Sequence, residues 1–160
     1  MLNDALEIIA NHDSITRLQN RYALNQNIPD YLGKDICIAL GDINRFKAVN
    51  DTYGHRTGDD VLKAFSDILM ETFEEKYVYR YGGDEFLIIN NSGDIDTFKK
   101  ELNQVNEKFS AVKIENLSMQ LGCSFGVLKA HAKDPKDFFG QIIKAAQLLY
   151  QEKDKIKLNR

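Results

Sequence analysis

Carboxylates at two places in the sequence could share a divalent cation. Asp42 follows a short apolar run, and the acids Asp84 and Glu85 follow two glycines. Two carboxylates held close together repel each other, and a hard divalent cation relieves that repulsion. Because Mg²⁺ takes one or two carboxylates together with substrate phosphate oxygens, a pairing of Asp42 with Asp84 predicts a site for a nucleoside triphosphate. Taken separately, Asp42 is more typical of a solvated turn, and residues 82–85 equally suit a glycine-led turn with two exposed acids.

The polar stretch at residues 46–59 supplies a further group of candidates. It contains two glycines and leads into a helix that we expect from residue 60 onward. Lys47 could neutralise a phosphate as a point charge. Asn50 by itself is most simply a turn residue, and Asp59 at a helix start is most simply an N-cap. On their own, the residues of this stretch do not decide between a structural and a functional role.

The spacing of apolar residues predicts the elements that must position these candidates. We expect helices over residues 3–10, 20–32, 60–73, 95–110 and 135–155, and strands over residues 35–42, 77–81, 86–89 and 117–129. The four residues between the second and third strands predict a hairpin. This order, with few strands joined by long helices, implies an α+β fold in which helices pack on a mixed sheet.

Length and composition exclude several classes of protein. The 160 residues suit one domain, and 43% hydrophobic with 28% charged residues is ordinary for a globular protein. A net charge of −3 gives no broad electrostatic footprint for nucleic acid or an anionic membrane, so we expect neither as a partner. No apolar run is long enough to cross a bilayer, and residues 1–11 lack the pattern of a signal peptide. Cys37 and Cys123 sit in apolar segments without metal-ligand spacing, which favours buried reduced thiols and a cytoplasmic location.

Taken together, the motifs of this chain resemble those of the GGDEF domain, the diguanylate cyclase family. The matching segments are Asp42–Asp51, Gly54-His55, Gly58-Asp59, Arg80–Phe86 with its Gly-Gly-Asp-Glu-Phe string, Ser124–Val127 and Leu149-Tyr150. The resemblance covers about residues 12–160 as one domain and leaves residues 1–11 as a lead-in helix. It implies a mixed, mostly antiparallel central sheet flanked by helices, in the palm arrangement of nucleotidyl cyclases and ferredoxin-like folds. In a longer protein, a sensor domain would attach at the N-terminal side or an effector domain at the C-terminal side.

The resemblance also implies an enzymatic activity. Members of the family condense two GTP molecules into cyclic di-GMP and release two pyrophosphates, with two protomers facing each other as a homodimer. By this resemblance Asp42, the backbone carbonyl of Ile43 and Asp84 would hold Mg²⁺, with two ions in each active site and Mn²⁺ as an alternative metal. Asp84 would also help to remove the proton from the attacking 3′-hydroxyl, and Glu85 would assist beside the metal. This chemistry suits a two-metal displacement at the α-phosphorus.

Three lysines match family positions that contact phosphate. Lys47 would neutralise charge in the transition state, whereas Lys153 and Lys157 would reach the triphosphate from one face of the last helix. A solvated basic tail is the alternative explanation for the last two. Gly83, together with Gly82, would let the nucleotide lie against the turn.

The guanine base would be recognised by Asn50 and Asp59, which match the family's guanine-binding positions. Guanine presents N1–H and N2–H₂ donors, and the carboxylate of Asp59 can accept both. Adenine lacks this donor pair and would leave a carboxylate unpaired, so we expect GTP to be preferred over ATP. His55 either contacts the nucleotide or packs within the turn.

Several positions depart from the family pattern. They are Arg17 in place of glycine, Gln19 in place of proline, Asn44 in place of a common second aspartate, Ile156 in place of glycine and Lys157 in place of arginine. The product-inhibition motif R-x-x-D of many members is replaced by residues 73–76, so we expect no product inhibition through that site. These departures leave two other functions open, namely a domain that binds GTP to regulate a partner without turnover and a dimerisation domain with a decayed site. The intact acids favour the cyclase.

Overall fold

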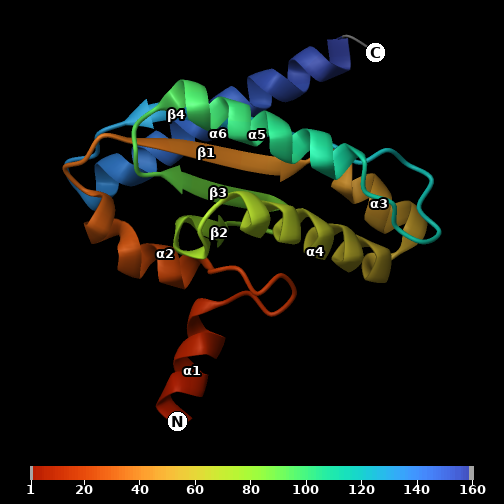
Figure 1. The fold of residues 1–160 in the computed structure, drawn as a ribbon, viewed down its shortest axis with the longest axis horizontal. Helices are drawn as coiled ribbons and strands as arrows, with labels where there is room; N and C mark the ends of the chain where they lie inside the picture. The colour runs from red at the N-terminus through yellow and green to blue at the C-terminus, as the bar shows by residue number, and fades with distance from the viewer. Residues whose placement is uncertain (1, 159–160) are drawn as a thin grey trace.

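A four-stranded sheet forms the centre of the computed structural model, which describes the backbone of residues 2–158 and the side chains of residues 2–156 (Figure 1). In the spatial order β2-β3-β1-β4, the strands are β2 (Val78–Arg80), β3 (Glu85–Asn90), β1 (Ile36–Ile43) and β4 (Cys123–Ala130). The helices are α1 (Leu2–Asn11), α2 (Arg21–Asn27), η1 (Ile28–Tyr31), α3 (Phe46–Tyr53), α4 (His55–Thr72), η2 (Glu75–Tyr77), α5 (Ile95–Ser110) and α6 (Pro135–Leu158). Each ladder between neighbouring strands is antiparallel.

Strand β1 lies inside the sheet and is buried along almost all of its length. Helices α4 and α5 cover one face of the sheet, and α2, η1 and α6 cover the other (Figure 1). Because side chains alternate along a strand, Ala39 packs in the cluster with α4 and α5, whereas Leu40 packs in the cluster with α6. By the same alternation, Asp42 lies on the α6 face at the end of β1.

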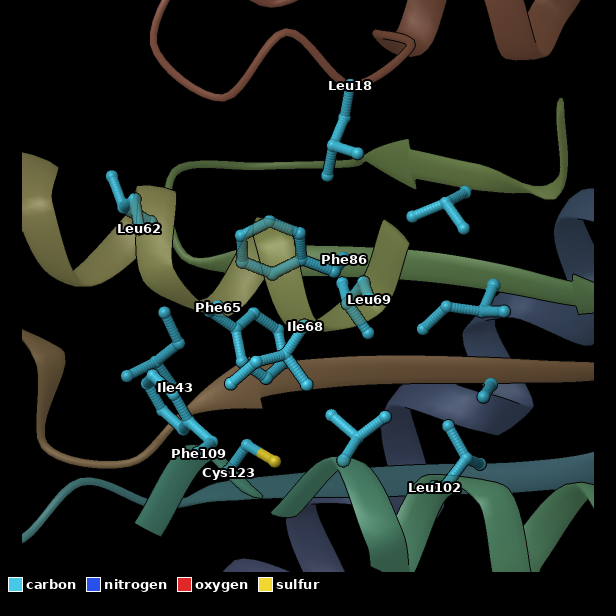
Figure 2. Close-up of a cluster of buried hydrophobic side chains, with 14 of the residues drawn as sticks. Leu18, Ile43, Leu62, Phe65, Ile68, Leu69, Phe86, Leu102, Phe109 and Cys123 are labelled. Carbon is cyan, nitrogen blue, oxygen red and sulfur yellow. The ribbon is translucent and has the colours of Figure 1, made fainter. Parts of the chain in front are cut away.

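The cluster beneath α4 and α5 fixes these helices on the sheet (Figure 2). The ring of Phe65 in α4 lies 4.9 Å from that of Phe86 in β3 and 4.8 Å from that of Phe109 in α5, edge-on in both cases. Such edge-to-face pairs stabilise a core beyond the area that they bury. Ile43 at the end of β1 and Leu62 of α4 belong to the same cluster. The core therefore holds the end of β1 and the first half of α4 in a fixed relation.

The α+β class, with a largely antiparallel sheet flanked by helices, is confirmed, but the sheet is not mixed. Its ladders are all antiparallel, and within residues 2–158 the parallel pairing is confined to an isolated bridge between Gln19 and Tyr79. That bridge attaches the loop before α2 to the edge strand β2. Cys37 and Cys123 are free and buried, as the sequence predicts.

Two segment boundaries predicted from the sequence are wrong. The polar stretch at residues 46–59 forms α3 and the first turns of α4, so α4 begins at His55 and not near residue 60. Helix α3 spans eight residues and only Val49 is buried, so few apolar positions mark this helix in the sequence. Residues 117–122 are not a strand, because β4 begins at Cys123. Their alternating apolar residues pack against the core from a loop.

Helix α1 projects away from the rest of the molecule (Figure 1), and none of its residues is buried. Leu2, Leu6 and Ile9 are exposed. Asn20 holds the end of the helix, since its backbone N–H donates to the Asn11 carbonyl at 2.9 Å and its side-chain amide to the Ala10 carbonyl at 2.8 Å. Across residues 2–158, no helix is both long and apolar enough to cross a membrane.

Candidate active site

A cavity of about 490 Å³ lies beside β4 between α5 and α6, and none of the predicted site residues lines it. A smaller cavity, of about 340 Å³, lies where α3, α4 and the β2–β3 turn meet. Its lining contains predicted site residues from three parts of the sequence, namely Lys47, Asn50, His55, Asp59, Gly83 and Asp84. The smaller cavity is therefore the candidate active site, because predicted site residues up to 37 positions apart in the sequence converge on it.

The corner between α3 and α4 positions the candidates for base recognition. Gly54, with a φ of +90°, separates the two helices. A Cβ atom at Gly58 would lie only 1.9 Å from Asn50 Oδ1, so the missing side chain lets Asn50 pack directly against α4. Asp59 is half-buried in the second turn of α4 and is not the N-cap that its position in the sequence suggests. His55 is exposed at the start of α4, on the cavity lining.

The two glycines of the β2–β3 turn have different roles. Neither Gly82 nor Gly83 has a positive φ, so the turn does not need glycine for its backbone angles. A Cβ atom at Gly82 would lie 2.5 Å from Glu85 Oε1, whereas a Cβ atom at Gly83 would meet nothing within 4 Å. Gly82 therefore makes room for the Glu85 carboxylate, and Gly83 alone leaves the open surface that both glycines were expected to provide.

Asp42 and Asp84 lie side by side at the end of the sheet. Asp42 is paired in register with Glu85 across β1 and β3, which brings it next to the turn that carries Asp84. Burial raises the pKa of Asp42 to about 6, and the adjacent Asp84 carboxyl acts in the same direction, whereas hydrogen bonding to Lys153 opposes both. Asp42 Oδ2 lies 2.5 Å from Lys153 Nζ. Asp42 Oδ1 is buried and accepts no hydrogen bond from the described residues.

This donor set fits a magnesium ion that is completed by substrate oxygens. A buried carboxylate oxygen without a partner is costly, and a cation would satisfy it. Within residues 2–158, no three His, Cys, Asp or Glu side chains gather into a ready-made metal site. Mg²⁺ does not need one, because it binds through one or two carboxylates plus phosphates and waters. The Ile43 side chain is buried in the core, so only its backbone carbonyl could join Asp42 and Asp84 as a ligand.

The two described lysines assigned to phosphate differ in their surroundings. Lys47 is exposed on α3 at the cavity lining. Lys153 of α6 is paired with Asp42 rather than extended into solvent, so it is not part of a solvated tail. The side chain of Lys157 lies outside the described residues. Asn44 is engaged with β4, since its Oδ1 accepts a hydrogen bond from Ser124 Oγ at 2.8 Å.

Arg80 is a site residue to which the sequence motifs assigned no role. Its Nη1 donates to both carboxylate oxygens of Asp13 at 2.9 and 2.8 Å, and its Nη2 donates to the Gly83 carbonyl at 2.6 Å. Burial would raise the pKa of Asp13, but hydrogen bonds from Thr16 and Arg80 hold it below its ordinary value. Arg80 therefore clamps the turn that carries Asp84 to the loop before α2. Opposite charges 67 positions apart give no pairing signal in a single sequence.

The departures from the family pattern near the N-terminus have a clear structural setting. Arg17 has a φ of +64°, a left-handed conformation that glycine adopts with the least strain. The Gln19 side chain donates to the Glu75 carbonyl at 2.9 Å and accepts from Asn27 at 3.2 Å. Glutamine thus fastens this loop to η2 and α2 by side-chain hydrogen bonds that proline could not make.

Comparison with known proteins matches this geometry to one family. The family model described as diguanylate cyclase, GGDEF domain, matches residues 10–159. The diguanylate cyclase DosC of Escherichia coli is 25% identical over 147 residues, covering 82% of this chain and 32% of its own. DgcZ of Escherichia coli is 43% identical over 89 residues, covering 52% of this chain and 30% of its own. The chain thus spans about a third of the length of these curated relatives.

Solved structures agree with the family model. The coiled coil and GGDEF domain of DgcB from Caulobacter crescentus, in complex with c-di-GMP, superimposes with a TM-score of 0.85 at 25% identity, covering 96% of this chain and 87% of that one. The diguanylate cyclase SiaD from Pseudomonas aeruginosa, in complex with its activator SiaC, gives a TM-score of 0.82 at 26% identity, covering 96% and 62%. Since the family model matches nearly the whole chain, this protein belongs to the GGDEF domain family of diguanylate cyclases.

Proposed function

We propose that this chain is the catalytic domain of a diguanylate cyclase, which joins two GTP molecules into cyclic di-GMP and releases two pyrophosphates. The observation that carries the proposal is the half-buried pair of carboxylates, Asp42 and Asp84, in which Asp42 has a buried oxygen without a partner, beside a cavity lined by Lys47, Asn50 and Asp59. A structural role alone does not account for placing two acids together at a buried strand end. The names of the relatives DosC and DgcZ support the same activity.

Asp42, Asp84 and the Ile43 carbonyl would hold Mg²⁺, with two ions in each active site and Mn²⁺ as a substitute. The metal, when bound, would neutralise phosphate charge and lower the pKa of the attacking hydroxyl. Asp84 would accept the proton of the 3′-hydroxyl, and Glu85 would support it from the same turn. Lys47, Lys153 and Lys157 would bind phosphate oxygens and balance their charge.

Asn50 and Asp59 would read the guanine base from the corner between α3 and α4. The Asp59 carboxylate accepts from N1–H and N2–H₂, and His55 lies on the same cavity lining as a further contact. Replacing Asp59 with serine should reduce the preference for GTP over ATP, measured as the ratio of the two binding constants. Full guanine preference in the Asp59→Ser variant would contradict the assignment.

Two copies of the chain would face each other, because one site holds one GTP and the product needs two. The exposed apolar side chains of α1 offer a surface on which two copies could associate. Activity per chain should then rise with protein concentration. A constant specific activity over a wide dilution series would count against a homodimeric enzyme.

The direct test is to incubate the chain with GTP and Mg²⁺ and to separate the nucleotides by chromatography. We expect cyclic di-GMP and pyrophosphate, and we expect neither from an Asp84→Asn variant that unfolds at a similar temperature. The absence of product from the unaltered chain at high concentration would contradict the proposal. No product inhibition through residues 73–76 is expected, because Glu74 and Lys76 there form an exposed ion pair with each other.

A regulatory domain that binds GTP without turnover is the second candidate. It is favoured by one comparison: the cyclic di-GMP phosphodiesterase NbdA of Pseudomonas aeruginosa is 35% identical over 92 residues, covering 53% of this chain and 12% of its own. This chain is thus similar to a segment of a protein that is named for a different activity. Binding of GTP without formation of cyclic di-GMP would identify this second function.

A further inference from the structure

Lys153 pairs with one oxygen of the carboxylate whose other oxygen is free to hold a metal. Its ammonium lies 2.5 Å from Asp42 Oδ2, and the exposed fractions of the two side chains are 28% and 13%. The pair is therefore largely shielded from solvent, where a salt bridge is stronger than at the surface. On the other oxygen, Oδ1, no described group donates a hydrogen bond.

The core of the protein sets the position of this lysine. Ala145 and Leu149 of α6 are buried on the sheet, and the backbone of α6 approaches so closely that a Cβ atom at Gly126 would lie 2.0 Å from the Ala145 carbonyl oxygen. Lys153 follows Leu149 by one helical turn, so it lies on the same side of α6. Lys155, two residues further, points to Glu152 instead and forms an exposed pair with it at 3.1 Å.

Charge balance makes the lysine and the metal competitors. Asp42 and Asp84 carry two negative charges, and the ammonium of Lys153 compensates one of them. A divalent cation on the free oxygen Oδ1 would share this carboxylate with the ammonium of Lys153, and the two positive charges would repel each other. The lysine therefore weakens metal binding at Asp42 for as long as it stays there. A nucleoside triphosphate supplies the negative oxygens that can receive it.

We propose that Lys153 is an internal counter-ion that weakens metal binding at the Asp42 carboxylate until a nucleoside triphosphate draws the lysine away. This inference rests on the proposed function, because it assigns to the same site a coupling between metal and nucleotide. Metal alone binds weakly, and each ligand strengthens the binding of the other by the same factor, as linkage requires. Lys153 thereby keeps the affinity of Asp42 and Asp84 for a cation low in the absence of substrate.

The test measures Mn²⁺ alone, by electron paramagnetic resonance of the free ion, on the whole chain and on Lys153→Met. We expect Lys153→Met to bind Mn²⁺ at least about tenfold more tightly than the unaltered chain in the absence of nucleotide, since a competing cation has been removed. Lys155→Met is the matched control, because it removes an exposed lysine from the same helix and should leave the affinity unchanged. Lys153→Gln, which keeps a polar side chain but removes the charge, should behave as Lys153→Met does.

A second arm repeats the titration with the non-hydrolysable analogue guanosine-5′-(α,β-methylene)triphosphate. The analogue should strengthen Mn²⁺ binding in the unaltered chain and do so much less in Lys153→Met. Equal or weaker binding of Mn²⁺ alone by both Lys153 variants, at unchanged unfolding temperature, would overturn the inference. Tighter binding of Mn²⁺ by the variants together with no cyclic di-GMP from the unaltered chain would support the counter-ion and refute the proposed enzyme, so the two failures are distinguishable.

Discussion

Two buried polar clusters lie on the α6 face of the sheet, and they are built in opposite ways. In one, the hydroxyls of Tyr31 and Tyr79 lie 2.7 Å apart, Asn27 donates to Tyr79 at 3.0 Å, and the Lys76 carbonyl accepts from Tyr79 at 3.2 Å. In the other, Asp42 has an oxygen without a donor.

The two clusters also differ in charge. Burial raises the pKa of both tyrosines, so they stay neutral, whereas Asp42 ionises at a pH of about 6 despite its burial. The tyrosine cluster satisfies its own groups and stabilises the fold. The carboxylate pair leaves one buried oxygen, Asp42 Oδ1, free to bind a cation, and a carboxylate with a shifted pKa is typical of a functional site.

The largest expected effect is on turnover. Asp84→Asn removes the charge and the proton acceptor at the carboxylate pair, and we expect the rate of cyclic di-GMP formation to fall by about 10³-fold. The measurement is the initial rate under saturating GTP and Mg²⁺. If Asp84→Asn kept an activity within tenfold of the unaltered chain, the carboxylate pair would not have the catalytic role that distinguishes it from the tyrosine cluster.

The second-largest effect concerns the free energy of unfolding, which we expect the substitution Asp42→Asn to increase. Because the pKa of Asp42 is raised from 3.8 to about 6, the folded state prefers the protonated acid, and stability present at low pH is lost as the pH rises through about 6. Asp42→Asn avoids this loss, so in EDTA it should be more stable than the unaltered chain by on the order of 1–3 kcal/mol at pH 7.

That difference between Asp42→Asn and the unaltered chain should shrink towards zero near pH 3, below the ordinary aspartate pKa of 3.8, where the acid is mostly protonated in both folded and unfolded states. Urea unfolding at the two pH values measures it. A variant that is less stable than the unaltered chain at pH 7 would mean that the carboxylate pair is a stabilising feature, like the tyrosines.

The tyrosine cluster should respond in the opposite direction. Tyr79→Phe leaves the Asn27 amide and the Lys76 carbonyl with fewer partners, and we expect it to lower the free energy of unfolding by about 1–2 kcal/mol. Turnover at saturating GTP should not change. Tyr22→Phe is the control, since Tyr22 is 52% exposed and its change should stay within about 0.5 kcal/mol. If Tyr79→Phe were as stable as the unaltered chain, the tyrosine cluster would not have the stabilising role that distinguishes it from the carboxylate pair.

The smallest effect concerns the corner between α3 and α4. Gly58→Ala would push the Asn50 side chain out of its place, and we expect KM for GTP to rise about tenfold with little change in kcat. Gly140→Ala is the matched control, because a Cβ atom there meets nothing within 4 Å and KM should be unchanged. An unchanged KM in Gly58→Ala would show that Asn50 does not contact the nucleotide.

The sequence predicts the centre of the site better than its surroundings. Apolar runs predict β1 and the hairpin, and their pairing is what brings Asp42 next to Asp84. Helix α3 is short and buries only Val49, so its helical form and the place of Asp59 within α4 were not predicted. The contacts of Arg80 with Asp13 and of Lys153 with Asp42 join distant parts of the chain, and they depend on packing that no local pattern contains.

The claim on which the account depends is that Asp42 and Asp84 share a cation with a nucleoside triphosphate. A crystal structure with the methylene analogue of GTP and Mn²⁺, with an anomalous difference map at the manganese edge, tests it most directly. The account predicts a peak between the two carboxylates and the phosphates, with Lys153 on a phosphate oxygen. A bound nucleotide with no peak at Asp42 and Asp84, or with metal held elsewhere, would contradict it.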